Sequence, residues 1–312
     1  MSTSNINLSG VIPIVPTPFD VDGDIDLGSF RNVLDYLVQS GVHGVAVLGM
    51  ASEGFAVTDR ERDLLVRTAA EQVNGAVPLV VGCSHSSAHA VAELAVASSD
   101  AGADALMVMP PALGSPIPAA VVEYFAAVDA AVDIPIMVQD NPAWTGMRIQ
   151  ASVYEKIADL AHVSYVKVET PHPPTTMRLI SDVVGDSLIL FGGLAGNWLP
   201  EELRSGIAGT MPASIMPQVY VGVWELWASG RHDEALALFH RFHPVIRVSG
   251  QPSIGIAMAK QLLVSAGAIK APFVRSPLRQ LSDQDRNDLE AVAAELDLID
   301  VMRGTRTVSN AA

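Results

Sequence analysis

Residues 163–171 read VSYVKVETP, an apolar run rich in β-branched residues that passes into polar ones. Such a run is typical of a buried strand, and the two-residue period of a strand places Lys167 on the same face as Tyr165 and Glu169. Lys167 is the one lysine of four that lies in an apolar strand pattern. A buried amine held in its neutral form is a nucleophile. The alternative is a structural lysine that pairs with Glu169 or with another inward-facing carboxylate.

The strand at 163–169 is one of eight short apolar segments that alternate with amphipathic helical patterns. Near-continuous apolar character is expected when both faces of a parallel strand are covered. Eight strand–helix units in order predict an α/β fold, a (β/α)8 or TIM barrel. An open doubly wound sheet is the alternative, but no Gly-x-Gly-x-x-Gly turn follows the first segment. The predicted strands cover residues 11–15, 44–48, 78–82, 105–109, 134–139, 163–169, 188–191 and 209–212.

The helical patterns carry recognisable ends. Thr58-Asp-Arg-Glu61 has the spacing of a capping box, and glycines follow the first three patterns. We predict a barrel over residues 8–216, a C-terminal helical appendage packed on it over 217–302, and a flexible tail over 303–312. The predicted helices cover residues 27–40, 58–74, 87–101, 118–131, 150–160, 174–184, 199–205, 219–229, 232–248, 254–266 and 283–298.

Composition excludes several classes of protein. The net charge of −15 argues against a nucleic-acid-binding surface, so an anionic substrate would need a local positive site. A single cysteine, Cys83, excludes an internal disulfide and fits a reducing compartment. No apolar run reaches the ~18 residues of a membrane span, and the first ten residues lack the basic start and apolar core of a signal peptide. We therefore expect a cytoplasmic protein without membrane partners.

The C-terminal ends of the strands should carry the active site of such a barrel. After the second strand, Gly49-Met-Ala-Ser-Glu-Gly54 offers small residues whose backbone N–H groups can converge on an anion, and Ser52 adds a hydroxyl. Glu53 is either a general base or a structural anchor. Gln139 lies on the inward face of its strand and could bind substrate. Asp140 either binds substrate or only caps the turn that follows, which is an ordinary role for Asp. The other strand-end residues expected to face substrate are Gly192, Gly193 and Ala213.

Metal ligation has one weak candidate. His85 and His89 are four residues apart, which on a helix would place both on one face. No third ligand is evident near them in the sequence, and His85 precedes the expected helix. We predict no metal ion and no other cofactor.

Several motifs in register resemble the N-acetylneuraminate lyase and dihydrodipicolinate synthase family of class I lyases, over about residues 8–300. The motifs are IPIVPTPFD at 12–20, the Gly49-x-x-x-Glu53 loop, QDNPAWTG at 139–146 and YVKVET at 165–170. The resemblance implies that Lys167 forms a Schiff base with a 2-keto acid substrate. It also implies that Met50, Ala51 and Ser52 bind the substrate carboxylate, and that the protein is a homo-oligomer, a dimer or a tetramer.

Four departures from the family pattern argue against dihydrodipicolinate synthesis. Met50 and Ala51 stand where typical members have two hydroxyl residues, and Gln139 stands where they have a proton-relaying tyrosine. Trp144 matches the arginine that binds a second carboxylate in the synthases, so it is a candidate for specificity or for lid packing. The stretch MPPALGSP at 109–116 lacks the tyrosine that a neighbouring subunit offers in the synthases.

A narrower resemblance is to the L-2-keto-3-deoxyarabonate dehydratase branch of that family. It rests on Ser52-Glu53, on Met137-Val-Gln-Asp-x-Pro142 and on Val163-Ser-Tyr-x-Lys167-x-Glu-Thr-Pro171. The implied reaction is dehydration of a 2-keto-3-deoxy sugar acid through a Schiff base, which with a five-carbon substrate gives 2-oxoglutarate semialdehyde. The loop at 111–118 is shorter than in that branch, which leaves the sugar acid open.

The sequence leaves two choices open. The base that removes the C3 proton is Glu169, Glu53, Ser52 or a water held by Gln139. The activity is a dehydratase, an aldolase that cleaves the C3–C4 bond and releases pyruvate, or a deaminase of a cyclic imino acid. A different class is a non-catalytic ligand-binding barrel, which a retained buried lysine argues against because an unused buried charge costs stability.

Overall fold

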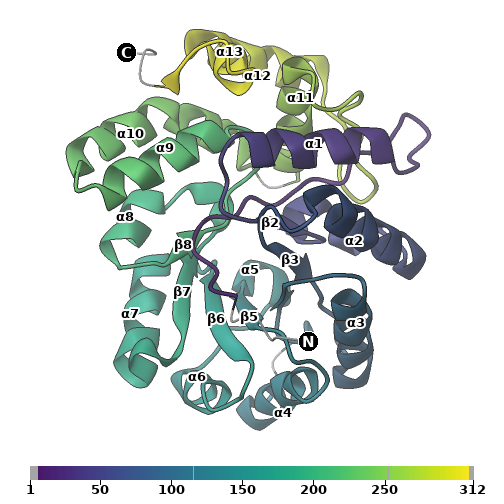
Figure 1. Ribbon diagram of the computed structural model, residues 1–312, viewed down its shortest axis with the longest axis vertical. Coiled ribbons are helices and arrows are strands. Elements are labelled where there is room, and N and C mark those ends of the chain that lie inside the picture. Colours follow the sequence, from purple (N-terminus) through teal and green to yellow (C-terminus); the bar gives the residue numbers. More distant parts are fainter. Residues whose placement is uncertain (1–5, 115, 252, 309–312) are drawn as a thin grey trace.

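The computed structural model describes residues 6–308 except 115 and 252. Their eight parallel strands form one curled sheet surrounded by helices (Figure 1). Each strand pairs with its neighbours in chain order, β1 pairs with β8, and a bridge between Ile14 and Ala46 closes the ring. This confirms the predicted (β/α)8 barrel. The strands are β1 (Gly10–Val11), β2 (Val45–Val47), β3 (Leu79–Gly82), β4 (Ala105–Val108), β5 (Ile136–Asp140), β6 (Val163–Val168), β7 (Ile189–Gly192) and β8 (Gly209–Thr210).

Most helices follow the predicted ranges. The capping box of Thr58 and Glu61 forms as expected, because each side chain accepts a backbone N–H of the other residue. Two short helices, α5 and α13, lie outside the predicted set. The helices are α1 (Leu27–Gln39), α2 (Asp59–Val73), α3 (Ala88–Asp100), α4 (Pro118–Asp129), α5 (Pro142–Thr145), α6 (Ala151–Ile157), α7 (Pro173–Val184), α8 (Leu199–Arg204), α9 (Pro217–Ala228), α10 (His232–Ser249), α11 (Gly255–Ala266), α12 (Asp283–Glu295) and α13 (Leu298–Met302).

The C-terminal helices lie against one side of the barrel, close to α1 and the β2 end (Figure 1). Helix α9 follows β8 and contacts β1, so it completes the ring of barrel helices, and the helices beyond it form the appendage. Residues 303–308 of the predicted tail make contacts, since Arg303 donates to the Ser265 carbonyl and Arg306 pairs with Asp297. Residues 309–312 of that tail lie outside the described residues. None of the helices described is long and apolar enough to cross a membrane.

The barrel interior is a separate core of inward-facing side chains. Tyr165 is 3% exposed and stacks edge-on against Phe191, with ring centroids 5.8 Å apart. Its hydroxyl accepts the Leu8 N–H at 3.0 Å and donates to the Ile6 carbonyl at 3.2 Å. The N-terminal segment thus closes the floor of the barrel. Because side chains alternate along a strand, Lys167 points into the barrel as Tyr165 does. Its position two residues further along β6 brings it nearer the C-terminal, open end.

A buried ion pair joins the appendage to the barrel mouth. Lys260 of α11 and Glu53, which follows β2, are both fully buried, and the Lys260 ammonium donates to Glu53 and to the Phe273 carbonyl at 2.7 Å. The second Glu53 oxygen accepts the Arg275 N–H at 2.8 Å. Lys260 and Arg275 both lie over the Phe19 ring. The conformation of the loop after β2 therefore depends on residues more than 200 positions away.

We predict that Lys260→Met destabilises the chain by about 3–5 kcal/mol, because it leaves the Glu53 carboxylate buried without its partner. The Lys260→Met/Glu53→Gln double variant should regain part of that loss, since an amide oxygen still accepts the Arg275 N–H. Urea unfolding of the two single variants and the double variant measures the coupling. Additive effects would show that the two side chains do not stabilise each other.

Candidate active site

Strand β6 carries Lys167 to the mouth of the barrel, and Glu169 follows directly after its end. Lys167 is 3% exposed, and its ammonium nitrogen lies 3.3 Å from Oε1 of Glu169. In the sheet, Lys167 is flanked by Gln139 of β5 and Phe191 of β7. The predicted pairing of an inward lysine with Glu169 is thus present. The pair lies at one end of a cavity, so burial alone does not account for its place.

The Glu169 carboxylate is held by groups from the ends of two neighbouring strands, β5 and β7. Oε2 accepts the Gln139 amide at 2.6 Å and the Asn141 amide at 3.2 Å, while Oε1 accepts the Leu194 N–H at 3.1 Å. Burial raises the pKa of Glu169, but the positive charge of Lys167 and these hydrogen bonds together hold it below its usual value. Glu169 is therefore a carboxylate at neutral pH, fixed beside the amine.

Two glycines at the end of β7, Gly192 and Gly193, leave space for two carboxyl groups. A Cβ on Gly193 would lie 2.7 Å from Glu169 Oε1, and a Cβ on Gly192 would lie 2.0 Å from Glu202 Oε2. Glu202 of α8 is fully buried; Oε1 accepts the Gly193 N–H at 3.4 Å, and Oε2 has no partner among the described residues. Burial raises the pKa of Glu202 to about 8, so this carboxyl is protonated at neutral pH. No local sequence pattern indicates Glu202, and the two glycines, which the sequence predicts to face substrate, lie against these carboxyl groups and outside the cavity lining.

The loop after β2 forms two short 3₁₀ turns, Met50–Ser52 and Gly54–Ala56. Glu53 between them has φ 56°, a left-handed conformation, and Thr17 donates to the Ser52 carbonyl at 2.6 Å. The N–H groups of Met50 and Ala51 have no acceptor among the hydrogen bonds of the described residues. Backbone N–H groups of such a turn can bind an anion.

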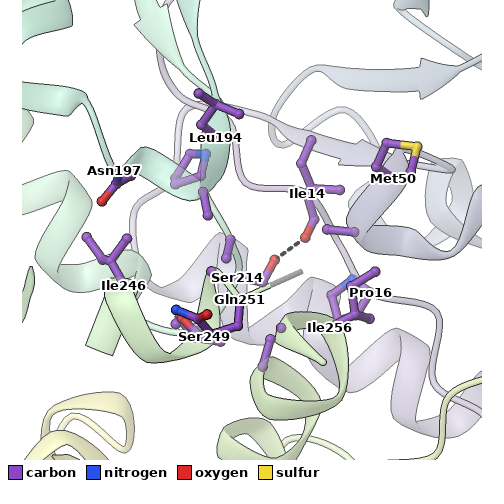
Figure 2. A pocket seen from close by; sticks show the side chains of 18 of the residues that line it. Ile14, Pro16, Met50, Leu194, Asn197, Ser214, Ile246, Ser249, Gln251 and Ile256 are labelled. Atoms are coloured by element: carbon purple, nitrogen blue, oxygen red, sulfur yellow. Dashed lines mark hydrogen bonds between the residues drawn. The ribbon is translucent and has the colours of Figure 1, made fainter. Parts of the chain in front are cut away.

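A cavity of about 690 Å³ opens over these strand ends (Figure 2). It brings together six of the residues that the sequence assigned to the site: Met50, Ala51, Trp144, Lys167, Glu169 and Ala213. Trp144 is 46% exposed and packs against Phe55, with ring centroids 5.2 Å apart. Gln139 is not on the cavity wall but contacts Glu169.

Three predicted site residues have other surroundings. Asp140 accepts the Tyr154 hydroxyl at 2.7 Å, outside the cavity lining, and burial raises its pKa to about 6. Glu53 was expected to be either a general base or a structural anchor, and its contacts are those of an anchor. One oxygen pairs with Lys260 in the fully buried ion pair, and the other accepts the Arg275 N–H. Ser52 is 1% exposed, and its hydroxyl has no partner among the described residues.

We predict that Glu202→Gln stabilises the chain increasingly as the pH rises from about 5 to 8. The folded pKa of about 8 exceeds the ordinary 4.5, so the wild type has the full contribution of the neutral carboxyl below 4.5 and loses it as the pH rises to 8. Glutamine cannot ionise, and the gain reaches as much as about 5 kcal/mol above pH 8. Urea unfolding at several pH values, with the exposed Glu155→Gln on α6 as control, measures it. Parallel stability curves for wild type and Glu202→Gln would contradict a buried neutral carboxyl.

Comparisons with known proteins show the family to which the chain belongs. The Dihydrodipicolinate synthetase family model matches residues 7–296. An L-2-keto-3-deoxyarabonate dehydratase of Azospirillum brasilense is 35% identical over 307 residues, which cover 95% of this chain and 97% of that protein. A 4-hydroxy-tetrahydrodipicolinate synthase of Methanopyrus kandleri is 27% identical, with 94% and 97% covered. The crystal structure of dihydrodipicolinate synthase from Rhodopseudomonas palustris superposes with a TM-score of 0.86 at 27% identity and covers 93% of this chain and 98% of that one. The chain belongs to the dihydrodipicolinate synthetase family.

Proposed function

We propose that the protein is a Schiff-base-forming lyase that dehydrates a 2-keto-3-deoxy sugar acid. The observation that carries this proposal is the lysine–carboxylate pair at the inner end of the cavity, with Lys167 3.3 Å from Glu169. A lysine that only balanced a buried carboxylate would need no cavity. The cavity gives a keto acid access to the amine.

The reaction starts at the Lys167 amine, which transfers its proton to Glu169 and attacks the C2 ketone. Glu169 gives this proton to the C2 oxygen, which leaves as water, and an iminium cation forms between C2 and the lysine nitrogen. Glu169 is then a carboxylate again. The cation makes the C3 proton more acidic, because it accepts the electron pair of the C3–H bond. Loss of this proton gives an enamine. The enamine returns its electrons and expels the C4 hydroxyl, which takes the proton that Glu169 removed from C3 and leaves as water. Tautomerisation and hydrolysis then release the product and restore the amine.

Glu169 is the base that we assign to the C3 step. It is the carboxylate among the cavity-lining residues, and its lowered pKa keeps it ionised at neutral pH. Gln139 and the Leu194 N–H hold its two oxygens in place. Gln139 is thus a positioning residue in this mechanism, and Glu53 is an anchor of the loop after β2.

The substrate carboxylate has a suitable site at the Met50 and Ala51 N–H groups. These two residues line the same cavity as Lys167, and their N–H groups are available. Backbone dipoles supply a local anion site in a chain with a net charge of −15. Gly49 has no side chain and Ala51 carries only a methyl group, which leaves the backbone of the loop accessible.

The choice of substrate follows the named relative. Its name gives L-2-keto-3-deoxyarabonate as the compound that it dehydrates. With this five-carbon acid, loss of water would give 2-oxoglutarate semialdehyde. The rival aldolase reaction starts from the same iminium and releases pyruvate, so the products separate the two. The homo-oligomeric state and the cytoplasmic location stay predictions from the sequence.

We predict that borohydride reduction with pyruvate or a 2-keto-3-deoxypentonate leaves a stable adduct on Lys167, which intact mass and peptide mapping detect. The adduct should disappear in Lys167→Ala, because no other lysine lines the cavity in the described part of the chain. Incubation with the sugar acid should yield a product about 18 daltons lighter, which distinguishes dehydration from cleavage. An absence of adduct with both keto acids would leave Lys167 a structural residue.

We predict that Glu169→Gln lowers kcat by about 10²–10⁴-fold, because it removes the base for the C3 proton. The exposed Glu93→Gln on α3 is a matched control and should leave kcat unchanged. Exchange of the C3 protons of pyruvate with deuterated water measures the same step apart from the loss of water. A variant Glu169→Gln that exchanges these protons at the wild-type rate would exclude Glu169 as the base.

A further inference from the structure

The cavity has a second end that the proposed reaction does not use. Figure 2 shows Ile14, Met50 and Leu194 on its barrel side and Ile246 and Ile256 on the side of the appendage. The helical side belongs to α10 and α11, and its walls are mainly apolar. The apolar residues that line this end include Ile215, Ile246, Ile256, Ala259, Leu263 and Leu278.

The cavity is larger than a five-carbon substrate needs. Such an acid has about ten non-hydrogen atoms, which at the ~30 Å³ that one water occupies in the liquid would fill roughly 300 Å³. The cavity holds about 690 Å³. More than half of the volume is therefore available to a longer molecule whose keto group lies at Lys167.

Three polar side chains of the lining already donate a hydrogen bond within the protein. Ser214 donates to the Ile14 carbonyl and Ser249 to the Val245 carbonyl, both at 2.7 Å. The Gln251 amide donates to the Arg247 carbonyl at 2.7 Å. Each of these groups would have to give up its bond before it could bind a sugar hydroxyl, which costs about as much as the new bond returns.

The remaining polar groups lie near solvent or have partners. Asn197 Oδ1 lies 3.0 Å from His243 Nε2, which engages its oxygen. Arg247 and Ser253 are exposed. The donors that stay free at this end, such as the Arg247 guanidinium and the Asn197 amide, thus belong to exposed side chains, whereas an apolar group would gain free energy against the apolar residues between α10 and α11.

We infer that this site takes 2-keto acids whose chain beyond C4 carries an apolar group, and that this group lies between α10 and α11. The inference rests on the proposed Schiff base at Lys167 and adds a substrate class to it. A 4-hydroxy-2-keto acid with an alkyl group on its far end would undergo the same dehydration. The keto and C4 positions stay at the barrel end, where Lys167 and Glu169 act.

The test uses linear 2-keto acids and borohydride trapping, with half-saturating concentration as the readout. Pyruvate reaches only the barrel end, whereas 2-ketohexanoate adds three carbons toward the appendage. Each buried methylene should tighten binding about threefold, so 2-ketohexanoate should trap roughly thirtyfold more tightly than pyruvate. The same six-carbon acid with a hydroxyl on its last carbon should lose most of that gain.

Two variants locate the effect. Ile256→Asn places an amide in the apolar wall, and Ala259→Phe fills the appendage end of the cavity with an aromatic ring. Both should abolish the preference for 2-ketohexanoate and leave the pyruvate adduct unchanged, which also shows that the variants fold. Leu179→Asn, an exposed residue of α7 that does not line the cavity, is the matched control.

The two proposals fail differently in this experiment. If pyruvate forms an adduct but 2-ketohexanoate binds no more tightly, the apolar substrate class is excluded and the Schiff-base lyase stands. The same holds if the preference persists in both cavity variants. If no 2-keto acid forms an adduct, the proposed function itself fails, and this inference fails with it.

Discussion

The whole site depends on one ion pair, the buried contact between Lys167 and Glu169 at the mouth of the barrel. Two charged groups in a protein interior are expensive to desolvate, and only mutual attraction and further hydrogen bonds offset that cost. Here Gln139, Asn141 and the Leu194 N–H supply those bonds to the carboxylate. The carboxylate therefore stays ionised at rest, and a single proton transfer over 3.3 Å from Lys167 would give a neutral amine and a neutral acid.

The surroundings of this pair explain several unusual residues. Gly193 is required because a Cβ there would collide with Glu169, and Gly192 because a Cβ would collide with Glu202. Glu202 adds a neutral carboxyl behind the site at the cost of an oxygen without a partner among the described residues. At the other side of the mouth, Glu53 and Lys260 fix the loop that carries Met50 and Ala51. The appendage is in this way part of the site, through one ion pair and one cavity wall.

Much of the fold followed from periodicity, because a parallel barrel needs eight apolar segments at regular spacing. The ends were harder: β1 and β8 have only two residues each in the sheet, since Pro13 and Pro212 flank them. Helix α5 was missed because its four residues are too few for a periodic pattern, although Asn141 and Pro142 are a cap and a first-turn proline. The lysine was recognisable because an isolated charge in an apolar strand stands out in a sequence.

Other parts of the site could not be predicted from local pattern. Glu202 lies in Leu199–Arg204, where two adjacent glutamates suggest a solvated helix face, and only the packing of α8 on Gly192 buries one of them. The role of Glu53 was open because its partner Lys260 is 207 residues away. Asp140 and Gln139 are neighbours on β5, and the strand alternation that separates them to opposite faces was visible in the sequence, but the acceptor of the Tyr154 hydroxyl was not.

The most direct test of the Schiff-base account is a crystal structure of the protein reduced with borohydride in the presence of pyruvate. The account predicts a covalent bond between C2 of pyruvate and the Lys167 nitrogen. It also predicts the pyruvate carboxylate on the N–H groups of Met50 and Ala51, and Glu169 beside C3. Pyruvate bound without a covalent bond, or with its carboxylate on Arg247 at the opposite end of the cavity, would contradict it.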